Sequence, residues 1–569
     1  MEAPAFAPPP TDPRRLDEAV ARVREAAPRW ARAPLAEKAA LARAMRDGLA
    51  RNAERQVRAS CAAKSIPFDH PASGDEWLAA YVTVRILAQA AGALATLARR
   101  GNTPVGRFGE TADGRLTEAV FPPNLLDRAL FSGARADVHY QEGVRAADAV
   151  ERRARFHKAP DHDGRVCAIL GAGNFNAIPP ADVAAKLFNE GKACVLKMNP
   201  VNAYLGPILE DAFAEAVARG VLAVVYGGAE VGEQLTGHPA VDEVHITGSN
   251  ATHDRIVWGP PGPEREARMA RDTPLLRKEI TSELGDTSPV LVVPGPWDDR
   301  ALAFQAQSVA GMVTVNASFN CIAVQALVLP RGWRRRDAFL SILERSMAAT
   351  PARAAWYPGS AERYRRLTEG RPEVRRAARA EPGTLPWTLI PDVDAERDDP
   401  VWRTEAFCAL LAETAVGSED PVEYLERAVE FTRERLHGTL SCNVVVHPRT
   451  LADPALAAAF ERALRRLRYG TVAVNCWTGY GFGFGTTPWG GFPGQPLTDV
   501  RSGRGFVHNT RMLEGVEKTV IRHPVSHPLK ALYFPTHRTV HHVIPPLIGV
   551  EAHRRWTSLP RVLSKALRA

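Results

Sequence analysis

Paired cysteines are missing from this chain of 569 residues. Its seven cysteines are odd in number, lie far apart and include no C-x-x-C pair. This pattern excludes a disulfide framework, and it indicates a reducing, cytoplasmic compartment. The six histidines that follow residue 520 are irregularly spaced and lack recurring carboxylate neighbours, so we expect no metal site.

The sequence also has few features typical of secreted, membrane or nucleic-acid-binding proteins. The N-terminus has no basic segment followed by an apolar run, which argues against a secretory signal. No uninterrupted apolar run approaches the roughly 18 residues of a membrane span, so we expect no integral membrane segment. The net charge of +8 comes from scattered arginines without zinc-ligand spacing or an aromatic-basic motif. We therefore expect solvated helix faces and no nucleic-acid partner.

The chain is too long for one hydrophobic core, which predicts at least two lobes. Residues 14–100 carry apolar residues at three- and four-residue spacing, typical of helices. From Arg165 the pattern changes to short apolar runs separated by amphipathic stretches, which predicts a doubly wound parallel α/β sheet. Ligands of such sheets lie at the carboxyl ends of the strands.

The predicted strand ends are rich in Gly, Asn, Ser and Thr, which suit phosphate and ribose contacts. They do not contain a G-x-G-x-x-G fingerprint, and G-G-A-E-V-G at 227–232 is only a loose variant. Nucleotide contacts and plain turn glycines therefore both remain open on composition alone.

Two residues between 279 and 326 have the chemistry of a catalytic pair. Glu283 stands in an apolar run before a glycine, and Cys321 follows Asn316 and Asn320. Most free cysteines are inert core residues, so these two positions alone carry little weight. A loop at 477–494 holds several aromatic residues and should pack over a site.

In chain order, several motifs resemble the aldehyde dehydrogenase superfamily from about Ala168 to Val520. They are GAGNFNAIPP, CVLKMNP, GHPAVDEVHITGS, SELGDTSP, NASFNCIAVQALV, TEAFCALL, and GTVAVNCW followed by PWGGFPG. The resemblance implies a cofactor-binding domain, a second α/β catalytic domain and a small strand-pair oligomerisation element. It also implies NAD- or NADP-dependent oxidation of an aldehyde.

The resemblance implies three catalytic roles. Cys321 would attack the aldehyde carbon, Asn174 would donate to the resulting oxyanion, and Glu283 would activate the water that releases the acid. Lys197 would contact the ribose, Gly248 and Ser249 the pyrophosphate, and Glu405 and Phe407 the nicotinamide end. The remaining candidate cofactor residues are Gly173, Asn199, Gly228, Gly232, Thr247 and Leu284.

The chain departs from the family pattern at several positions. Gly173 replaces a usual Trp, Asp286 replaces the second Gly of E-L-G-G, and Phe319 and Asn320 precede the nucleophile in place of the usual residues. Pro200 stands where members that prefer NAD often carry a Glu, so NAD and NADP remain equally open. The segment near 259–276 and the C-terminal extension are additions whose roles the sequence leaves open.

The expected domains are 1–283 for cofactor binding, with a protruding strand pair near 145–160, then 284–485 for catalysis, and 486–569 for a return segment and extension. We expect a homodimer or homotetramer with contacts at 145–160 and 515–530. The aromatic loop predicts an apolar or aromatic aldehyde. Two other functions stay open: transfer of the acyl group to CoA (or the reverse reduction), and a catalytically inactive scaffold.

Overall fold

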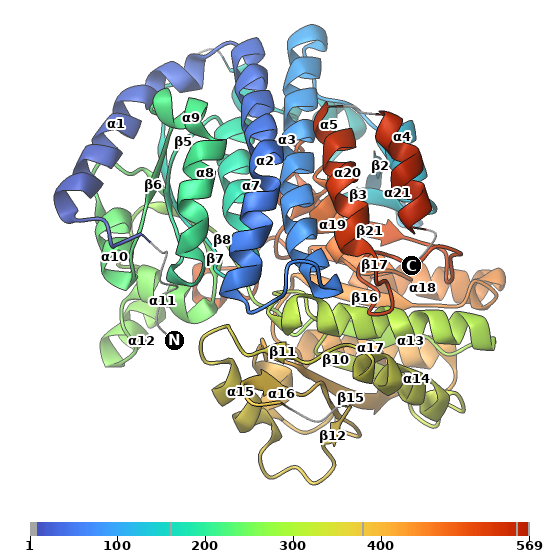
Figure 1. The fold of residues 1–569 in the computed structure, drawn as a ribbon. Coiled ribbons are helices and arrows are strands. Elements are labelled where there is room, and N and C mark those ends of the chain that lie inside the picture. Colours follow the sequence, from blue (N-terminus) through green and yellow to red (C-terminus); the bar gives the residue numbers. More distant parts are fainter. Residues whose placement is uncertain (1–7, 160–161, 378–380, 554–555, 567–569) are drawn as a thin grey trace.

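The structure is a computed structural model that describes residues 8–159, 162–377, 381–553 and 556–566. It is built around two large sheets whose faces are covered by helices (Figure 1). The predicted α/β class with mainly parallel sheets is confirmed.

The first sheet holds the strands that the alternating pattern predicted. Its strands lie in the order β19-β8-β7-β4-β5-β6, and all neighbours are parallel except β19 and β8. Their bounds are β4 (Val166–Leu170), β5 (Ala193–Lys197), β6 (Leu222–Val225), β7 (Glu243–Gly248), β8 (Glu279–Leu284) and β19 (Gly503–Arg504).

Both faces of this sheet are buried, which explains why its strands are continuous apolar runs. Alternate residues of β4 face different cores. Val166 and Ala168 pack with α1 (Pro13–Arg32), α10 (Ala229–Gly237) and α11 (Asn250–Trp258). Cys167 and Ile169 join the core that contains α2 (Leu35–Ala63), α7 (Ile178–Ala184) and α8 (Gly206–Ala212).

The second sheet has eleven strands in the order β1-β2-β3-β21-β17-β16-β9-β10-β15-β14-β12. Neighbours are parallel from β21 to β14 and antiparallel at both ends. The bounds are β1 (Phe108–Glu110), β2 (Leu116–Phe121), β3 (Arg135–Tyr140), β9 (Pro289–Val292), β10 (Ala326–Pro330), β12 (Arg375–Arg376), β14 (Thr388–Ile390), β15 (Leu410–Val416), β16 (Ser441–Val445), β17 (Thr471–Val474) and β21 (Val516–Arg522).

Helices and short strands complete the body. Helices α13, α14, α17 and α18 accompany the large sheet, and α3 runs through the molecule beside α2 (Figure 1). Their bounds, with those of smaller elements used below, are α3 (Gly74–Arg100), α4 (Leu125–Leu130), α12 (Pro263–Ala270), α13 (Asp299–Thr314), α14 (Arg336–Ala348), α15 (Ser360–Thr368), α17 (Pro421–Glu434), α18 (Pro454–Arg466), α19 (Gly479–Phe484), β18 (Pro488–Trp489) and β20 (Val507–His508).

The strand pair predicted near 145–160 is wrong. This region forms α5 (Ala146–Arg152) and α6 (Arg155–Lys158), and α5 begins with a capping box between Arg145 and Asp148. The strand pair lies earlier, at β2 and β3, and belongs to the large sheet together with β21. Residues 108–140 therefore pair with the second sheet, although we placed them in the cofactor domain.

Strand β21 also constrains the predicted contact at 515–530. It pairs with β17 on one side and with β3 on the other. Its backbone hydrogen-bonding groups are thus used within the chain, and the free edge on this side of the sheet is β1.

The C-terminal extension docks on the N-terminal helices. Helix α20 (Val540–His553) packs on α3, and α21 (Leu559–Ala566) follows it. Buried Arg85 of α3 bonds Asp127 of α4 at 2.6 Å and Glu551 of α20 at 3.3 Å. Breaking a buried pair of this kind is costly, since it leaves an unpaired charge inside the protein.

Residues 71–100, which end with α3, form the single helical stretch in the described part of the chain that is long and apolar enough to span a membrane. In that stretch 72% of the apolar window is buried inside the protein. Such burial is typical of a core helix.

Candidate active site

Cys321 follows a tight left-handed turn at the end of α13. Asn316, Ala317 and Ser318 all have positive φ, between 52° and 63°. Non-glycine residues in this region cost on the order of 1–3 kcal/mol each, so surrounding contacts must hold the turn. The side chain of Asn316 supplies two of them, since it donates to the carbonyls of Phe319 (2.8 Å) and Asn174 (2.9 Å).

A buried ion pair supports this turn from the N-terminal helices. Lys64 Nζ bonds Glu76 at 2.8 Å and donates to Asn316 Oδ1 at 3.2 Å. The helical N-terminal region therefore helps to position the candidate nucleophile.

The structure brings Cys321 and Glu283 together. The Cys321 thiol donates to Glu283 Oε1 at a sulfur–oxygen distance of 3.4 Å. Glu283 lies near the end of β8 and is only 2% exposed, whereas Cys321 is partly exposed. Glu283 is a buried carboxylate without a cationic partner among the described residues, so it can hold a proton.

The electrostatics of this pair favour proton exchange near neutral pH. Burial, and secondly the charge of Asp182, raise the pKa of Glu283 to about 7. Burial, followed by the negative charges of Glu283 and Glu405, raises the pKa of the Cys321 thiol well above its usual value. A thiol with a raised pKa stays protonated at neutral pH, and Glu283 Oε1 is the carboxylate oxygen to which it donates.

Asp182 was not singled out by sequence reasoning. It sits in α7, accepts a hydrogen bond from Thr247 Oγ1 at 2.9 Å and faces His245 at 3.6 Å. The Thr247 side chain thus turns into this buried cluster. Asp182 lies on an apolar helix face and has no partner nearby in sequence, so the sequence gave no signal that it belongs to the site.

Asn174 lies beside the nucleophile loop. Its side chain is 6% exposed, and Nδ2 donates to the Phe319 carbonyl at 3.1 Å. The Phe319 carbonyl stands two residues before Cys321, so the Asn174 amide lies close to the thiol and could turn toward an oxyanion formed there.

Glu405 lies beside Gly285, the residue that follows β8. A Cβ placed on Gly285 would lie 2.2 Å from Glu405 Oε2, so only glycine allows the carboxylate this close. Burial raises the pKa of Glu405 to about 8. Phe407, at φ +45°, follows in the same loop.

Asp286 has a structural partner. It accepts from the Ser441 backbone N–H at 2.7 Å and from Ser288 Oγ at 3.3 Å. Burial raises its pKa well above the usual value. This residue therefore links β8 to β16, which accounts for its presence in place of the family's glycine.

The predicted cofactor residues gather at one edge of the first sheet, because their strands are parallel. Lys197 ends β5, Gly248 ends β7, and buried Leu284 ends β8. Gly228 and Ser249 are the N-caps of α10 and α11, and the Lys197 side chain passes 3.9 Å from the Cβ position of Gly232.

This edge fits a dinucleotide. Glycines at 228 and 248 leave the helix and strand ends open, and burial lowers the pKa of Lys197 to about 8. Oε1 of Glu405 is buried and has no hydrogen-bond partner in the described part of the chain. An unpartnered carboxylate oxygen beside glycine can receive a ribose hydroxyl.

Asn199 and Gly173, two of the predicted cofactor residues, make close contacts within the chain. The Asn199 side chain accepts from the Val201 N–H at 3.0 Å. A Cβ on Gly173 would lie 2.6 Å from Asn199 Oδ1 and 2.9 Å from Val201, so this position cannot hold the family's Trp without rearrangement. Phe319, another departure, packs edge-on to Trp356 at 4.9 Å between ring centroids.

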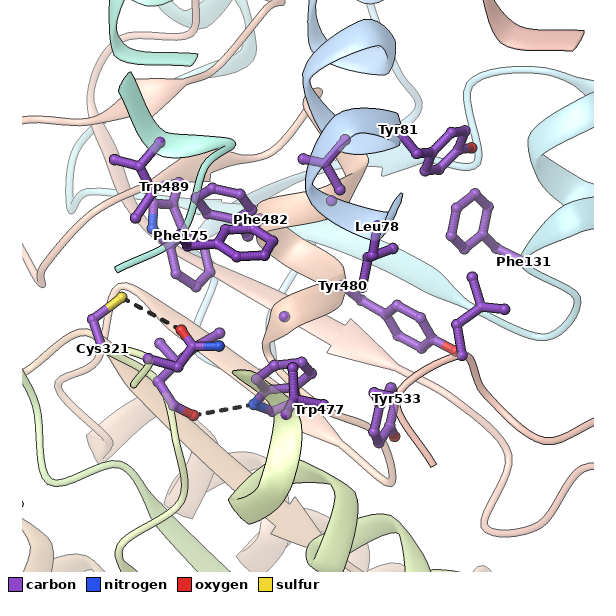
Figure 2. A pocket seen from close by; sticks show the side chains of 18 residues that line it. Leu78, Tyr81, Phe131, Phe175, Cys321, Trp477, Tyr480, Phe482, Trp489 and Tyr533 are labelled. Carbon is purple, nitrogen blue, oxygen red and sulfur yellow. Dashed lines mark hydrogen bonds between the residues drawn. The ribbon is translucent and has the colours of Figure 1, made fainter. Parts of the chain in front are cut away.

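Cys321 opens onto a strongly apolar cavity of about 90 Å³ (Figure 2). The predicted aromatic loop supplies Trp477, Tyr480, Phe482 and Trp489, part of it as α19. Trp477 Nε1 donates to the Ile322 carbonyl at 3.1 Å, which ties the loop to the nucleophile segment. Sequence reasoning missed the opposite wall, which consists of Leu78, Tyr81 and Val82 of α3, together with Phe131.

No group of three or more metal-binding side chains occurs among the described residues. The histidines of the extension that lie in this part of the chain therefore do not converge.

Comparison with known proteins agrees with this geometry. Residues 137–356 match the model of the aldehyde dehydrogenase family. This segment of the chain is therefore similar to the aldehyde dehydrogenase family. Over 219 residues it is 30% identical to proteins of Staphylococcus aureus strains MSSA476 and USA300 named "Putative aldehyde dehydrogenase". Each match covers 36% of this chain and 42% of the relative, so the chain spans less than half of these relatives' length.

Solved aldehyde dehydrogenases share the fold over most of the chain. An NADP-dependent glyceraldehyde-3-phosphate dehydrogenase from Bacillus halodurans C-125, complexed with NADP, is 18% identical, with 90% of this chain and 92% of that chain covered and a TM-score of 0.60. An NAD-dependent aldehyde dehydrogenase from Sinorhizobium meliloti is 19% identical, with 91% and 89% covered and a TM-score of 0.60. The aldehyde dehydrogenase fold thus extends well beyond the segment matched in sequence.

Proposed function

We propose that this protein oxidises an apolar or aromatic aldehyde to a carboxylic acid with NAD or NADP, through a covalent intermediate on Cys321. The observation that carries the proposal is the 3.4 Å contact between the Cys321 thiol and Glu283 at the inner end of an apolar cavity.

The residues support a sequence of proton and bond changes. Glu283 takes the thiol proton as Sγ bonds to the aldehyde carbon, and Asn174 donates to the oxyanion of the thiohemiacetal. NAD or NADP, when bound, supplies the acceptor for the hydride that leaves this carbon. The carbonyl then re-forms as a thioester on Cys321. After the hydride has left, Glu283 releases the thiol proton to solvent and is again a carboxylate. A water then loses a proton to Glu283 as it attacks the thioester, and the acid leaves as the Cys321 sulfur regains a proton from Glu283.

Lys197, Gly248, Ser249 and Glu405 are the residues that would hold the cofactor. The proposal leaves both cofactors open. A solved relative from Bacillus halodurans is complexed with NADP, and one from Pseudomonas syringae with NAD+. Pro200, which opens the short helix after β5, offers no carboxylate to repel a 2′-phosphate.

The proposal also includes the cellular compartment and the oligomeric state. All seven cysteines are unpaired and six are buried, in keeping with a reducing compartment such as the cytoplasm. We also expect a homodimer or homotetramer, with the exposed edge at β1 as the strand available for pairing.

The test is formation of reduced nicotinamide from a panel of aldehydes by the wild type and by Cys321→Ala. We expect turnover without CoA in the wild type and a loss on the order of 10⁴-fold in the variant, because the covalent route is removed. Cys194→Ala, a change at a buried cysteine near the start of β5, should retain activity within about twofold, because it lies outside the proposed site.

The same assay separates the alternatives. Turnover that strictly requires CoA would identify an acyl-transferring enzyme instead. Absence of both cofactor binding and activity in the folded wild type would identify a scaffold.

A further inference from the structure

A second cavity, of about 130 Å³, lies beyond the apolar cavity at Cys321. Five residues line both cavities and so form the partition between them: Tyr81, Phe131, Tyr480, Leu532 and Tyr533. In Figure 2, Phe131, Tyr480 and Tyr533 lie together at the end of the first cavity that is remote from Cys321. The partition is therefore made largely of aromatic side chains.

The rings of the partition touch edge to face and do not form a sealed stack. The centroids of Tyr480 and Tyr533 are 5.9 Å apart at 78°, and those of Phe131 and Tyr480 are 6.1 Å apart at 87°. Tyr480 remains partly exposed within this surface. Rings in this arrangement can part by rotation of single side chains, which needs no movement of the sheets.

The C-terminal extension builds the second cavity. Phe534, Val543 and Leu547 of the extension line it, together with Phe304 of α13 and Leu130 of α4. The rest of the lining is more polar and includes His523, His527 and Ser132. A chain without the extension would have no outer wall here.

The extension is held against α13, the helix that leads to the nucleophile. Tyr533 OH and Ser308 Oγ are 2.9 Å apart, and Gln305 Nε2 donates to the Val525 carbonyl at 2.8 Å. A Cβ on Gly311 would lie 2.3 Å from the Tyr533 carbonyl oxygen, so this close backbone contact requires glycine. The position of Tyr533 is thus set by α13.

We infer that the two cavities form one channel for an aldehyde with a long, unbranched apolar body. The carbonyl lies at Cys321, the chain passes between Tyr480 and Tyr533, and its distal half occupies the second cavity. This inference rests on the proposed function. The first cavity ends at the partition, so a short aldehyde lies within it and only a long chain reaches the second.

The inference is tested by binding rather than turnover. Butanal and decanal are titrated into Cys321→Ala protein without cofactor, and binding is followed by the fluorescence of the cavity tryptophans or by calorimetry. Each buried methylene should tighten binding roughly fourfold, so affinity should continue to rise with chain length up to decanal. Affinity that stops rising at butanal would overturn the inference.

Ala531 lines the second cavity and not the first, so Ala531→Trp fills the distal space. In the Cys321→Ala background we expect decanal affinity to fall roughly tenfold or more, and butanal affinity to stay within about twofold. Ala458→Trp on the exposed side of α18 is the matched control and should change neither. Leu529→Trp, at another position of the second cavity only, replaces Ala531→Trp if that variant does not fold.

Equal losses for both aldehydes, or none for either in a folded variant, would show that the second cavity is not part of the channel. Because neither cofactor nor Cys321 takes part, length-dependent binding without oxidation by the wild type would leave this inference intact and refute the proposed function.

Discussion

The two sides of Cys321 differ in chemistry. On the inner side, the charge of Asp182 helps to raise the pKa of Glu283, and the charges of Glu283 and Glu405 help to raise the pKa of the thiol. On the outer side, the cavity is lined by aromatic and aliphatic side chains from α3, α19 and the extension. Under the proposed function, the inner side would govern proton transfer for any aldehyde, and the outer side would govern which aldehyde fits. Changes on the inner side should affect short and long substrates equally.

The largest effect on the inner side is expected from Glu283→Gln. Loss of the base should lower kcat on the order of 100- to 1,000-fold for butanal and decanal alike. Because the proposed route uses Glu283 both for the attack by Cys321 and for the hydrolysis, no thioester should build up on Cys321 beyond the wild-type level, which mass spectrometry of the intact protein checks. Glu279→Gln, at the exposed start of the same strand, is the matched control and should behave as wild type.

The pH profile tests the same residue independently. The pKa of Glu283 is raised to about 7 by burial, so the wild-type rate should rise as the carboxylate forms through that pH. In Glu283→Gln this acidic limb should disappear. An unchanged limb would assign it to another group and remove Glu283 from the proposed role.

Asn174→Ala should have the second largest effect. Loss of an oxyanion donor commonly costs about 100-fold in kcat, and the loss should again be independent of chain length. Steady-state kinetics with butanal and decanal measures it. Asn52→Ala, which removes an amide that bonds only within α2 through the Gly48 carbonyl, controls for general destabilisation. A loss confined to KM would instead indicate substrate positioning.

The smallest effect is expected from Asp182→Asn. The negative charge of Asp182 helps to raise the pKa of Glu283, so its removal should lower that pKa. The acidic limb of the rate profile should therefore move to lower pH, while the rate at pH 8 should change by less than about threefold, since Glu283 is ionised there in both proteins. A limb that moves to higher pH would contradict the proposed coupling between the two carboxylates.

Sequence reasoning succeeded where the signal is local. The strands of the first sheet are continuous apolar runs because both faces are buried, and their order along the chain matches the alternating pattern. It failed at 145–160, where a charged segment was read as strands and the capping box at Arg145 and Asp148 was overlooked.

The prediction of the site divides in the same way, between residues with a local signal in the sequence and residues without one. Glu283 and Cys321 stood out because a carboxylate in an apolar run and a thiol after asparagines are unusual within a few residues of sequence. Asp182, Lys64 and Phe131 did not stand out, because their partners lie far along the chain. Lys64, for example, reaches Asn316 across 252 positions.

The sequence by itself determined the α/β class and the strand ends of the first sheet, which depend on burial patterns that act over a few residues. It also singled out Glu283 and Cys321, whose roles as base and nucleophile are implied by the resemblance of the motifs to aldehyde dehydrogenases. Only the tertiary structure decided the 3.4 Å approach of Cys321 to Glu283, the membership of β1–β3 in the large sheet and the outer wall supplied by the extension. These features arise when elements distant in sequence pack together, and the pKa of Glu283 depends on the neighbours that such packing brings to it.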